Sequence, residues 1–171
     1  AIFSKGDEYK GYDAAKLFED GKGKIQENNK AIMAKIEADK KKKEEEFAAN
    51  QQKLVDDLKA TMQSTPSGLY YKITKKTEGV APKKGEDVAV HYAGKLVDGT
   101  EFDSSFKRNQ PIDIPIGVGQ VIKGWDEGIM LLKEGETATL LIPSELGYGA
   151  NGAGGVIPPN AWLIFDVELV K

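Results

Sequence analysis

The glycine-rich stretch "GYGANGAGGVIPP" (147–159) has the residue types most suggestive of a chemical site. Its first six residues fit G-x-G-x-x-G, in which glycines let the backbone cradle a dinucleotide pyrophosphate. That motif needs a strand before the glycines and a helix whose N-terminus meets the phosphate. Here Pro158 and Pro159 follow, and proline cannot continue a helix beyond its first turn. The stretch therefore predicts a surface loop beside an apolar groove rather than a nucleotide site.

Other groups that commonly carry catalysis are scarce. The one histidine, His91, lies in "AVHYA", where we expect a sheet residue rather than a base or a metal ligand. The absence of cysteine excludes disulfides, thiolate nucleophiles and zinc fingers. The hydroxyls of "DSS" (103–105) have only one imidazole to activate them, which disfavours a nucleophilic triad. We expect no cofactor and no metal ion.

Length and charge narrow the class of protein. The chain has 171 residues and a net charge of -3, enough for one or two domains and unlike a nucleic-acid binder. No apolar run approaches the roughly 18 residues of a membrane span. The chain begins with Ala1 rather than methionine, as we expect of a processed secretory product or an excised fragment.

The N-terminal part of the chain, ahead of the candidate site residues, is predicted to form a long helix. Residues 23–62 contain no proline and, after Gly23, no glycine, and are rich in helix-forming Ala, Lys, Glu and Gln. The charged run "KKKKEEE" (40–46) is expected to be a solvated part of this helix. Because an isolated amphipathic helix is marginal in water, we expect the helix to pair with a second copy or a neighbouring domain. Its apolar face comprises Ile25, Ile32, Ile36, Phe47, Leu54, Leu58 and Met62.

From Gly68 onward the pattern changes to short β-branched or alternating segments separated by turns. The one helical stretch among them, "VIKGWDEGIMLL" (121–132), is the natural cover for one face of a short sheet. The predicted class is α+β, with a long N-terminal helix before a β-rich domain. The predicted strands are 69–76, 87–97, 112–117, 137–143 and 161–171.

The sequence predicts three regions. Residues 1–22 form an irregular segment, 23–66 a helical arm that ends near Pro66, and 67–171 the β-rich domain.

Three long motifs occur in this domain: "VAVHYAGKLVDGTEFDSSF", "VIKGWDEGI" and "LGYGANGAGGVIPPNAWLIFDVELVK". In this order and at these intervals they resemble the FKBP-type peptidyl-prolyl cis-trans isomerases, over residues about 68–171. The resemblance implies a five-stranded antiparallel sheet curled around a short helix. It also implies an enzyme that isomerises X-Pro bonds of polypeptide substrates in an apolar pocket during protein folding, and that macrolides can inhibit.

The resemblance carries the family's pocket over position by position. It implies that Trp125 forms the floor, that the Tyr148 hydroxyl and the Ile122 backbone N–H hold substrate carbonyls, and that Asp103 contacts the twisted carbonyl or orients Tyr148. The implied catalytic residues are Tyr92, Phe102, Asp103, Trp125, Tyr148 and Phe165, and the implied substrate-binding residues are Ile112, Ile114, Val121, Ile122 and Ile157.

Three positions depart from the family's pattern. Ile112 stands where a Phe is common, Ala153 where a His is sometimes found, and Ala93 where a Thr is frequent. These departures bear on macrolide affinity and on the preference for the residue before proline.

The N-terminal region has weaker resemblances. The helical arm is similar to that of dimeric periplasmic members, where it mediates dimerisation, so we expect a homodimer in the periplasm or cell envelope. Residues 2–18 resemble the end of a cyclophilin-type domain, which would make the chain part of a two-isomerase fusion. Two alternatives remain: a non-catalytic chaperone or proline-peptide-binding module dimerised by the arm, and a dimer scaffold built on the arm.

Overall fold

The computed structural model describes residues 13–171. The chain divides into two compact units, Ala1–Phe47 and Ala48–Lys171, and α1 contributes helix to both. Within residues 13–171, no helix is both long and apolar enough to cross a membrane. The elements, with η for a 3-10 helix, are α1 (Ala14–Lys59), β1 (Gln63–Ser64), β2 (Tyr70–Lys75), β3 (Asp87–Leu96), β4 (Glu101–Ser104), α2 (Ser105–Arg108), β5 (Ile112–Pro115), α3 (Lys123–Ile129), β6 (Thr137–Ile142), η1 (Ser144–Leu146), η2 (Gly149–Asn151) and β7 (Leu163–Leu169).

Helix α1 begins at Ala14, so the prediction of an irregular segment up to residue 22 is wrong for the last nine of those residues. Gly21 and Gly23 lie inside the helix, where an added Cβ would meet nothing within 4 Å. A glycine inside a helix costs it about 1 kcal/mol relative to alanine. The Ala-, Lys- and Glu-rich sequence around them is a strong enough helix former to offset this.

The charged run 40–46 is an exposed part of α1, as expected. Opposite charges four residues apart lie on the same side of a helix and stabilise it by a few tenths of a kcal/mol each. The pairs are Lys40–Glu44, Lys41–Glu45 and Lys42–Glu46, with N–O distances of 3.8 to 3.9 Å.

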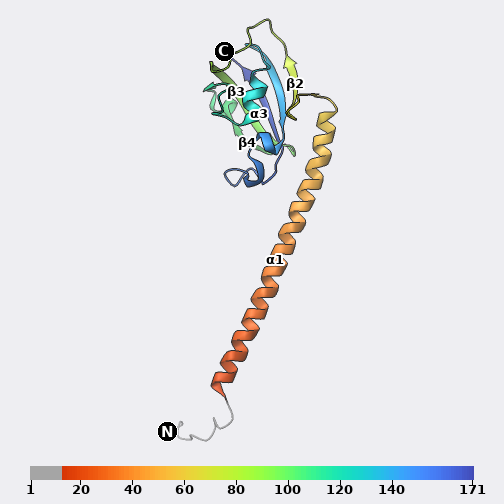
Figure 1. Cartoon of the computed structure of the whole chain (residues 1–171), viewed down its shortest axis with the longest axis vertical. Coiled ribbons are helices and arrows are strands. Elements are labelled where there is room, and N and C mark those ends of the chain that lie inside the picture. Colours follow the sequence, from red (N-terminus) through yellow and green to blue (C-terminus); the bar gives the residue numbers. More distant parts are fainter. Residues whose placement is uncertain (1–12) are drawn as a thin grey trace. The chain divides into compact units, whose positions relative to one another are not determined.

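Within residues 13–171 the strands form one seven-stranded antiparallel sheet, ordered β1-β2-β6-β7-β3-β4, with β5 also paired to β3. The sheet curls around α3 (Figure 1). The predicted α+β class is therefore confirmed. Strands β1 and β4 were not predicted, because their two and four residues are too short for an alternating pattern to stand out.

Helix α3 packs against the inner face of the sheet through two glycines. A Cβ on Gly124 would lie 2.5 Å from Ile142 Cγ2, and one on Gly128 would lie 2.6 Å from Leu140 Cδ1. Real side chains do not tolerate such contacts, so this close approach to β6 requires glycine at both positions.

The outer face of the sheet is covered by the C-terminal turns of α1, which belong to the unit Ala48–Lys171. Neighbours along a strand point to opposite faces, so Leu140 faces α3 whereas Leu141 packs against Val55 of α1. This cluster consists of buried Val55, Val97 and Leu141 with partly buried Leu54, Leu58, Met62, Tyr70, Trp162 and Ile164. The compact unit thus starts at Ala48 rather than at the predicted boundary of 67.

Helix α1 ends at Lys59, before the predicted end near Pro66. Gln63 and Ser64 instead pair with Tyr71 and Tyr70 as β1, and the Tyr71 hydroxyl donates to Gln63 Oε1 at 2.8 Å. The competing sheet contact explains the early end.

Candidate active site

A cavity of about 540 Å³ opens beside α3. Its lining brings together segments from β3, β4, β5, α3, β7 and the loops before α3 and around η2. The lining residues are Tyr92, Phe102, Asp103, Ile112, Gln120, Val121, Ile122, Trp125, Tyr148, Ile157 and Phe165.

All but one of the sequence-predicted site residues line this single cavity; the exception is Ile114. The register of β5 on β3 explains the exception. Ile112 lies opposite Val90, near Tyr92, whereas Ile114 lies opposite Val88, one step further from Tyr92. Gln120 lines the cavity although no sequence pattern singled it out.

Three aromatic rings form the deep part of the cavity. Trp125, at 5% exposure, meets Tyr92 at 5.0 Å and 77° and Phe165 at 5.3 Å and 86°, between ring centroids and planes. Such edge-to-face contacts are favourable for aromatic pairs. Because the rings hold one another at right angles, they keep their positions without filling the space between them.

Gly94 of β3 makes room for the aromatic side of the cavity. A Cβ at this position would lie 2.7 Å from both Phe102 and Phe165, two rings that themselves meet at 5.6 Å and 81°. Sequence analysis gave Gly94 no role. Its signal is a glycine inside a strand pattern, which often marks close approach of other groups.

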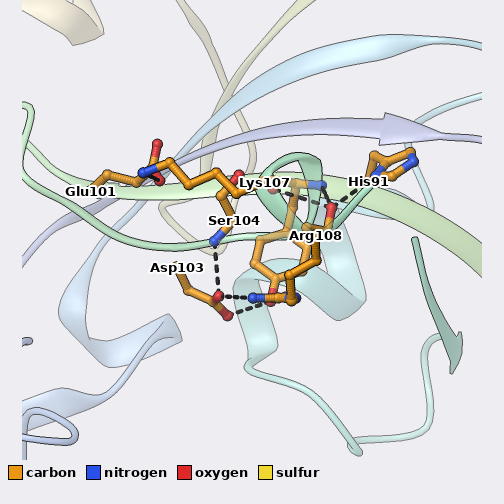
Figure 2. Close-up of polar contacts among 8 residues, drawn as sticks. His91, Glu101, Asp103, Ser104, Lys107 and Arg108 are labelled. Carbon is orange, nitrogen blue, oxygen red and sulfur yellow. Dashed lines mark hydrogen bonds and ion pairs between the residues drawn. The ribbon is translucent and has the colours of Figure 1, made fainter. Parts of the chain in front are cut away.

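Asp103 forms the polar edge of the cavity, at the end of β4 (Figure 2). Its carboxylate accepts hydrogen bonds from the Tyr92 hydroxyl, from Arg108 Nη1 at 2.5 Å and from the Ser104 backbone N–H at 2.8 Å. Arg108 Nη2 also donates to the Tyr92 hydroxyl at 2.9 Å. These bonds join Tyr92, Asp103 and Arg108 in one closed network.

This network sets the protonation states at the polar edge. The Arg108 guanidinium, and then the Tyr92 hydroxyl, hold the pKa of Asp103 below its usual value. Burial, and then the hydrogen bond to Asp103, raises the pKa of Tyr92. At neutral pH Asp103 is therefore charged and Tyr92 keeps its proton.

Arg108 was not predicted as a site residue, because the short helix α2 was not predicted. The turn of α2 brings it back to Asp103, and Asn109 ends the helix in the left-handed region at φ 49°. In the same segment Lys107 pairs with Glu101 at 2.7 Å (Figure 2). A basic pair soon after "FDSS" is the only signal that the sequence offers.

His91 lies on β3, where a sheet residue was expected. Its ring stacks on Phe106 at 4.9 Å and 14°, and its Nδ1 lies 2.9 Å from Ser105 Oγ. Ser105 Oγ also accepts the Tyr92 backbone N–H at 2.7 Å. Through Ser105, these contacts link His91 to the backbone of Tyr92, whose side chain belongs to the polar edge.

The loop before α3 is fixed by Asp126, another residue that the sequence patterns did not single out. Its carboxylate accepts the backbone N–H of Gly117 at 2.8 Å and of Gly119 at 2.6 Å. These bonds hold the loop that brings Val121 and Ile122 to the cavity. The helical stretch was predicted to begin at residue 121, but α3 begins at Lys123, because residues 121 and 122 belong to this loop.

Tyr148 stands at the mouth of the cavity, directly before η2. Burial, and then the charge of Asp103, raises the pKa of Tyr148, so its hydroxyl is protonated and can donate at neutral pH. Ile157 lies on the same loop, which closes on itself where Ala153 and Ile157 exchange backbone hydrogen bonds at 3.0 and 2.9 Å. A Cβ on Gly152 would come within 2.1 Å of the Ile157 oxygen.

Together, the curled sheet, the short helix and an aromatic cavity with one polar edge define the class of fold and site. The sequence profile of the FKBP-type peptidyl-prolyl cis-trans isomerases matches residues 78–170. An FK506-binding protein of Neisseria meningitidis serogroup C is 66% identical over 88 residues, which are 52% of this chain and 81% of the relative. This chain belongs to the FKBP-type peptidyl-prolyl cis-trans isomerase family.

Two further similarities include the helical region. A probable FKBP-type isomerase FkpA of N. meningitidis serogroup B is 47% identical over 147 residues, 86% of this chain and 53% of that protein. The crystal structure of FkpA from Escherichia coli matches with a TM-score of 0.69 and 35% identity, over 86% of this chain and 70% of that one. The predicted family and enzyme class are confirmed. These similarities give no support to a cyclophilin-type remnant at 2–18, most of which lies outside the described residues.

Proposed function

We propose that the cavity accelerates rotation about X-Pro bonds by binding the twisted amide better than the planar one. Rotation costs about 18–20 kcal/mol because it breaks the partial double bond. The twisted amide is less dipolar than the planar one, so an apolar cavity disfavours it less, and differential binding of this kind lowers a barrier. The single observation that carries the proposal is the joint cavity of Trp125, Tyr148 and Phe165.

Each lining group has a proposed role. The Trp125 ring is the floor beneath the pyrrolidine ring, with Tyr92, Phe102 and Phe165 as walls. The aliphatic residues that complete the apolar lining are Ile112, Val121, Ile122 and Ile157.

Two donors keep the substrate in register. The protonated Tyr148 hydroxyl and the Ile122 backbone N–H donate to substrate carbonyls on either side of the bond that rotates. The charged Asp103, held by Arg108, fixes Tyr92 and faces the twisted carbonyl at the polar edge. In this proposal no group transfers a proton, so the rate should depend little on pH near neutrality.

A protease-coupled assay on a proline peptide tests this proposal. Trp125→Ala removes the floor, and losing about 2–3 kcal/mol of apolar contact in the transition state should lower kcat/KM by about 30- to 160-fold. Tyr148→Phe removes only the hydroxyl and should act through KM. Val80→Ala is the matched control, because Val80 is exposed and lies outside the cavity lining. A wild-type chain that leaves the spontaneous rate unchanged contradicts the proposal.

The alternative is a chaperone or proline-peptide-binding module without significant turnover. Exposed apolar side chains favour it, namely Tyr148 at the cavity and Val156 on the loop that carries Ile157. Suppression of aggregation of a proline-free client would support this alternative if Trp125→Ala retained it in full.

We further propose that a second copy covers the apolar face of α1 within the first unit. Its residues recur at helical spacing and are 48 to 64% exposed, which an isolated helix in water does not favour. Sedimentation equilibrium at micromolar concentration tests this, with Ile25→Lys as the disrupting variant and Glu27→Lys as the control. A wild-type monomer at high concentration contradicts it. The exposed residues are Leu17, Phe18, Ile25, Ile32, Met33 and Ile36.

We also propose that the cavity accepts a macrolide. The relatives named FK506-binding proteins support this, while Ile112, in place of a common Phe, should weaken the contact. Competition between FK506 and a proline peptide tests it, with Ile112→Phe expected to bind more tightly than the wild type.

For the compartment, we propose the periplasm or cell envelope. The support is the resemblance of the helical arm to the FkpA-type relatives. Fractionation of cells that express the intact native gene tests this, and recovery in the cytosol contradicts it.

A further inference from the structure

We propose that Gln51 of α1 is a positioning residue for isomerisation, acting on the loop that carries Tyr148 and Ile157. This inference rests on the proposed function, since it concerns the same cavity. Gln51 itself does not line that cavity. It is one of the few polar side chains buried in the described chain, at 8% exposure.

The Gln51 side-chain amide forms two hydrogen bonds with the backbone just before β7. Its Nε2 donates to the Asn160 oxygen at 3.1 Å, and its Oε1 accepts the Trp162 backbone N–H at 2.7 Å. The two bonds bracket Ala161, which is buried. They thus supply to an irregular segment the two partners that a neighbouring strand would supply in a sheet.

The gripped segment is bonded directly to the Tyr148 side of the cavity. The Asn160 N–H donates to the Gly149 oxygen at 2.9 Å, and Gly149 follows Tyr148 in the chain. Asn160 adopts φ 57°, an uncommon conformation for a non-glycine residue that the surrounding bonds must hold. A continuous path therefore leads from the Gln51 amide through Asn160 to the backbone beside Tyr148.

The hydrogen bonds of Gln51 and Asn160 support both ends of the loop that carries Tyr148 and Ile157. Ile157 lies between η2 and Asn160, and its own bonds to Ala153 close only the tip of the loop. At the base, the partners are Gly149 and Gln51. The loop has five glycines between Gly147 and Gly155, which restrict a backbone less than other residues do, so these bonds contribute to its order.

Gln51 is held in place by its own helix. Val55 is fully buried in the outer cluster, and the Lys59 ammonium lies 4.5 Å from the Trp162 ring centroid. Positions 51, 55 and 59 are four residues apart and so share one helical face. That face presents an amide, a methyl pair and a cation to the segment around Trp162.

The test uses the full chain with paired substitutions at adjacent glutamines. Gln51→Met keeps the length of the side chain but removes both hydrogen bonds. Gln52→Met is the matched control, because Gln52 is exposed and bonds only within the helix, to Asp56 at 2.7 Å. Val55→Ala loosens the docked helix while leaving the Gln51 amide in place.

Catalysis and loop order are measured well below the melting temperature of every variant. We expect Gln51→Met to lower kcat/KM about 3- to 10-fold, mainly through KM, because a misplaced binding group loses alignment. The amide resonances of Tyr148, Gly149 and Ile157 should shift or broaden in the same variant. Gln52→Met should change neither readout, and Val55→Ala should lower the melting temperature with less than about a 2-fold change in kcat/KM.

A second substitution separates the two hydrogen bonds. Gln51→Glu keeps an acceptor for the Trp162 N–H but sets a carboxylate oxygen against the Asn160 oxygen. Hydrogen exchange at Trp162 should stay slow while the Tyr148 and Gly149 resonances change. This variant also carries the test if Gln51→Met does not fold.

The outcomes are distinguishable. An active wild type in which Gln51→Met and Gln51→Glu leave kcat/KM and the Tyr148 resonances unchanged overturns the positioning role alone. An equal loss of kcat/KM in Val55→Ala and Gln51→Met, at equal loss of stability, also overturns it. A wild type without activity contradicts the proposed function, whereas the loop resonances still decide whether Gln51 orders the loop.

Discussion

The two faces of the sheet each carry one of the chain's two tryptophans, and the faces are packed differently. On the inner face Trp125 lies on a seven-residue helix and borders an open cavity of about 540 Å³. On the outer face Trp162 is covered by side chains of α1. Leu140 and Leu141, adjacent on β6, contribute to opposite faces.

The difference between the two faces shows where this fold gives up complete packing and leaves room for a bound group. Protein interiors are normally filled to the density of organic crystals, and on the outer face side chains of α1 pack against Val97, Leu141 and Trp162. The inner face has a cavity even though glycines bring α3 close to β6, and the rings that line the cavity brace one another edge to face. Apart from Gln51, we therefore expect substitutions on the outer face to change stability first and those on the inner face to change catalysis first.

Removing the outer cover should have the largest effect. A chain that starts at residue 67 lacks Gln51, Val55 and Leu58, whereas one that starts at Ala48 keeps them. Because full burial of each large aliphatic side chain stabilises a fold by about 1.5–3 kcal/mol, the shorter chain should lose about 3–5 kcal/mol of unfolding free energy. Urea denaturation followed by tryptophan fluorescence measures this. Equal stability of the two fragments would return the domain boundary to residue 67.

Filling the inner face is expected to rank second. Gly94→Ala places a methyl group 2.7 Å from Phe102 and Phe165, and overpacking of this kind costs about 1–3 kcal/mol. The displaced rings should also lower kcat/KM on a proline peptide. Gly23→Ala is the control with the opposite sign, because it lies in open space on α1 and should stabilise the helix. If kcat/KM were unchanged in Gly94→Ala, the arrangement of the aromatic rings would not matter for catalysis, contrary to this prediction.

The polar edge should give the smallest effect. Arg108→Gln removes the main cause of the lowered pKa of Asp103, so that pKa should rise toward its usual value in an NMR titration. A carboxyl with a lowered folded-state pKa stabilises the fold above its unfolded pKa of about 3.9, and this contribution is lost as pH falls through the folded value. The substitution should therefore reduce the acid sensitivity of stability, by a small amount because the pair is half exposed. A pKa of Asp103 that stays low would assign the shift to Tyr92 and Ser104 instead.

The parts of the site that lie within long motifs could be predicted from the sequence. Strand alternation gives the sheet, and the motifs around Tyr92, Trp125 and Tyr148 give most of the lining. The helical pattern of α1 was also visible, but not its division. Leu54 and Leu58 pack on the sheet, whereas Ile25 remains exposed.

The features that were missed depend on contacts between distant residues. Gln51 and Trp162 are 111 positions apart, and no periodic pattern relates a helix face to a loop so far along the chain. Arg108 needed the four-residue helix α2, which is too short to have a pattern. Gly94 and Asp126 act through the space and the backbone groups of other elements, which only the folded chain specifies.

Exchange NMR of a proline peptide at equilibrium, with the chain present at about one hundredth of the peptide concentration, tests catalysis by the cavity most directly. We predict that cis-to-trans and trans-to-cis rates rise by the same factor, that the cis:trans ratio stays constant, and that Trp125→Ala removes most of the gain. Rates that remain spontaneous with the wild-type chain, or that rise equally with Trp125→Ala, would contradict it.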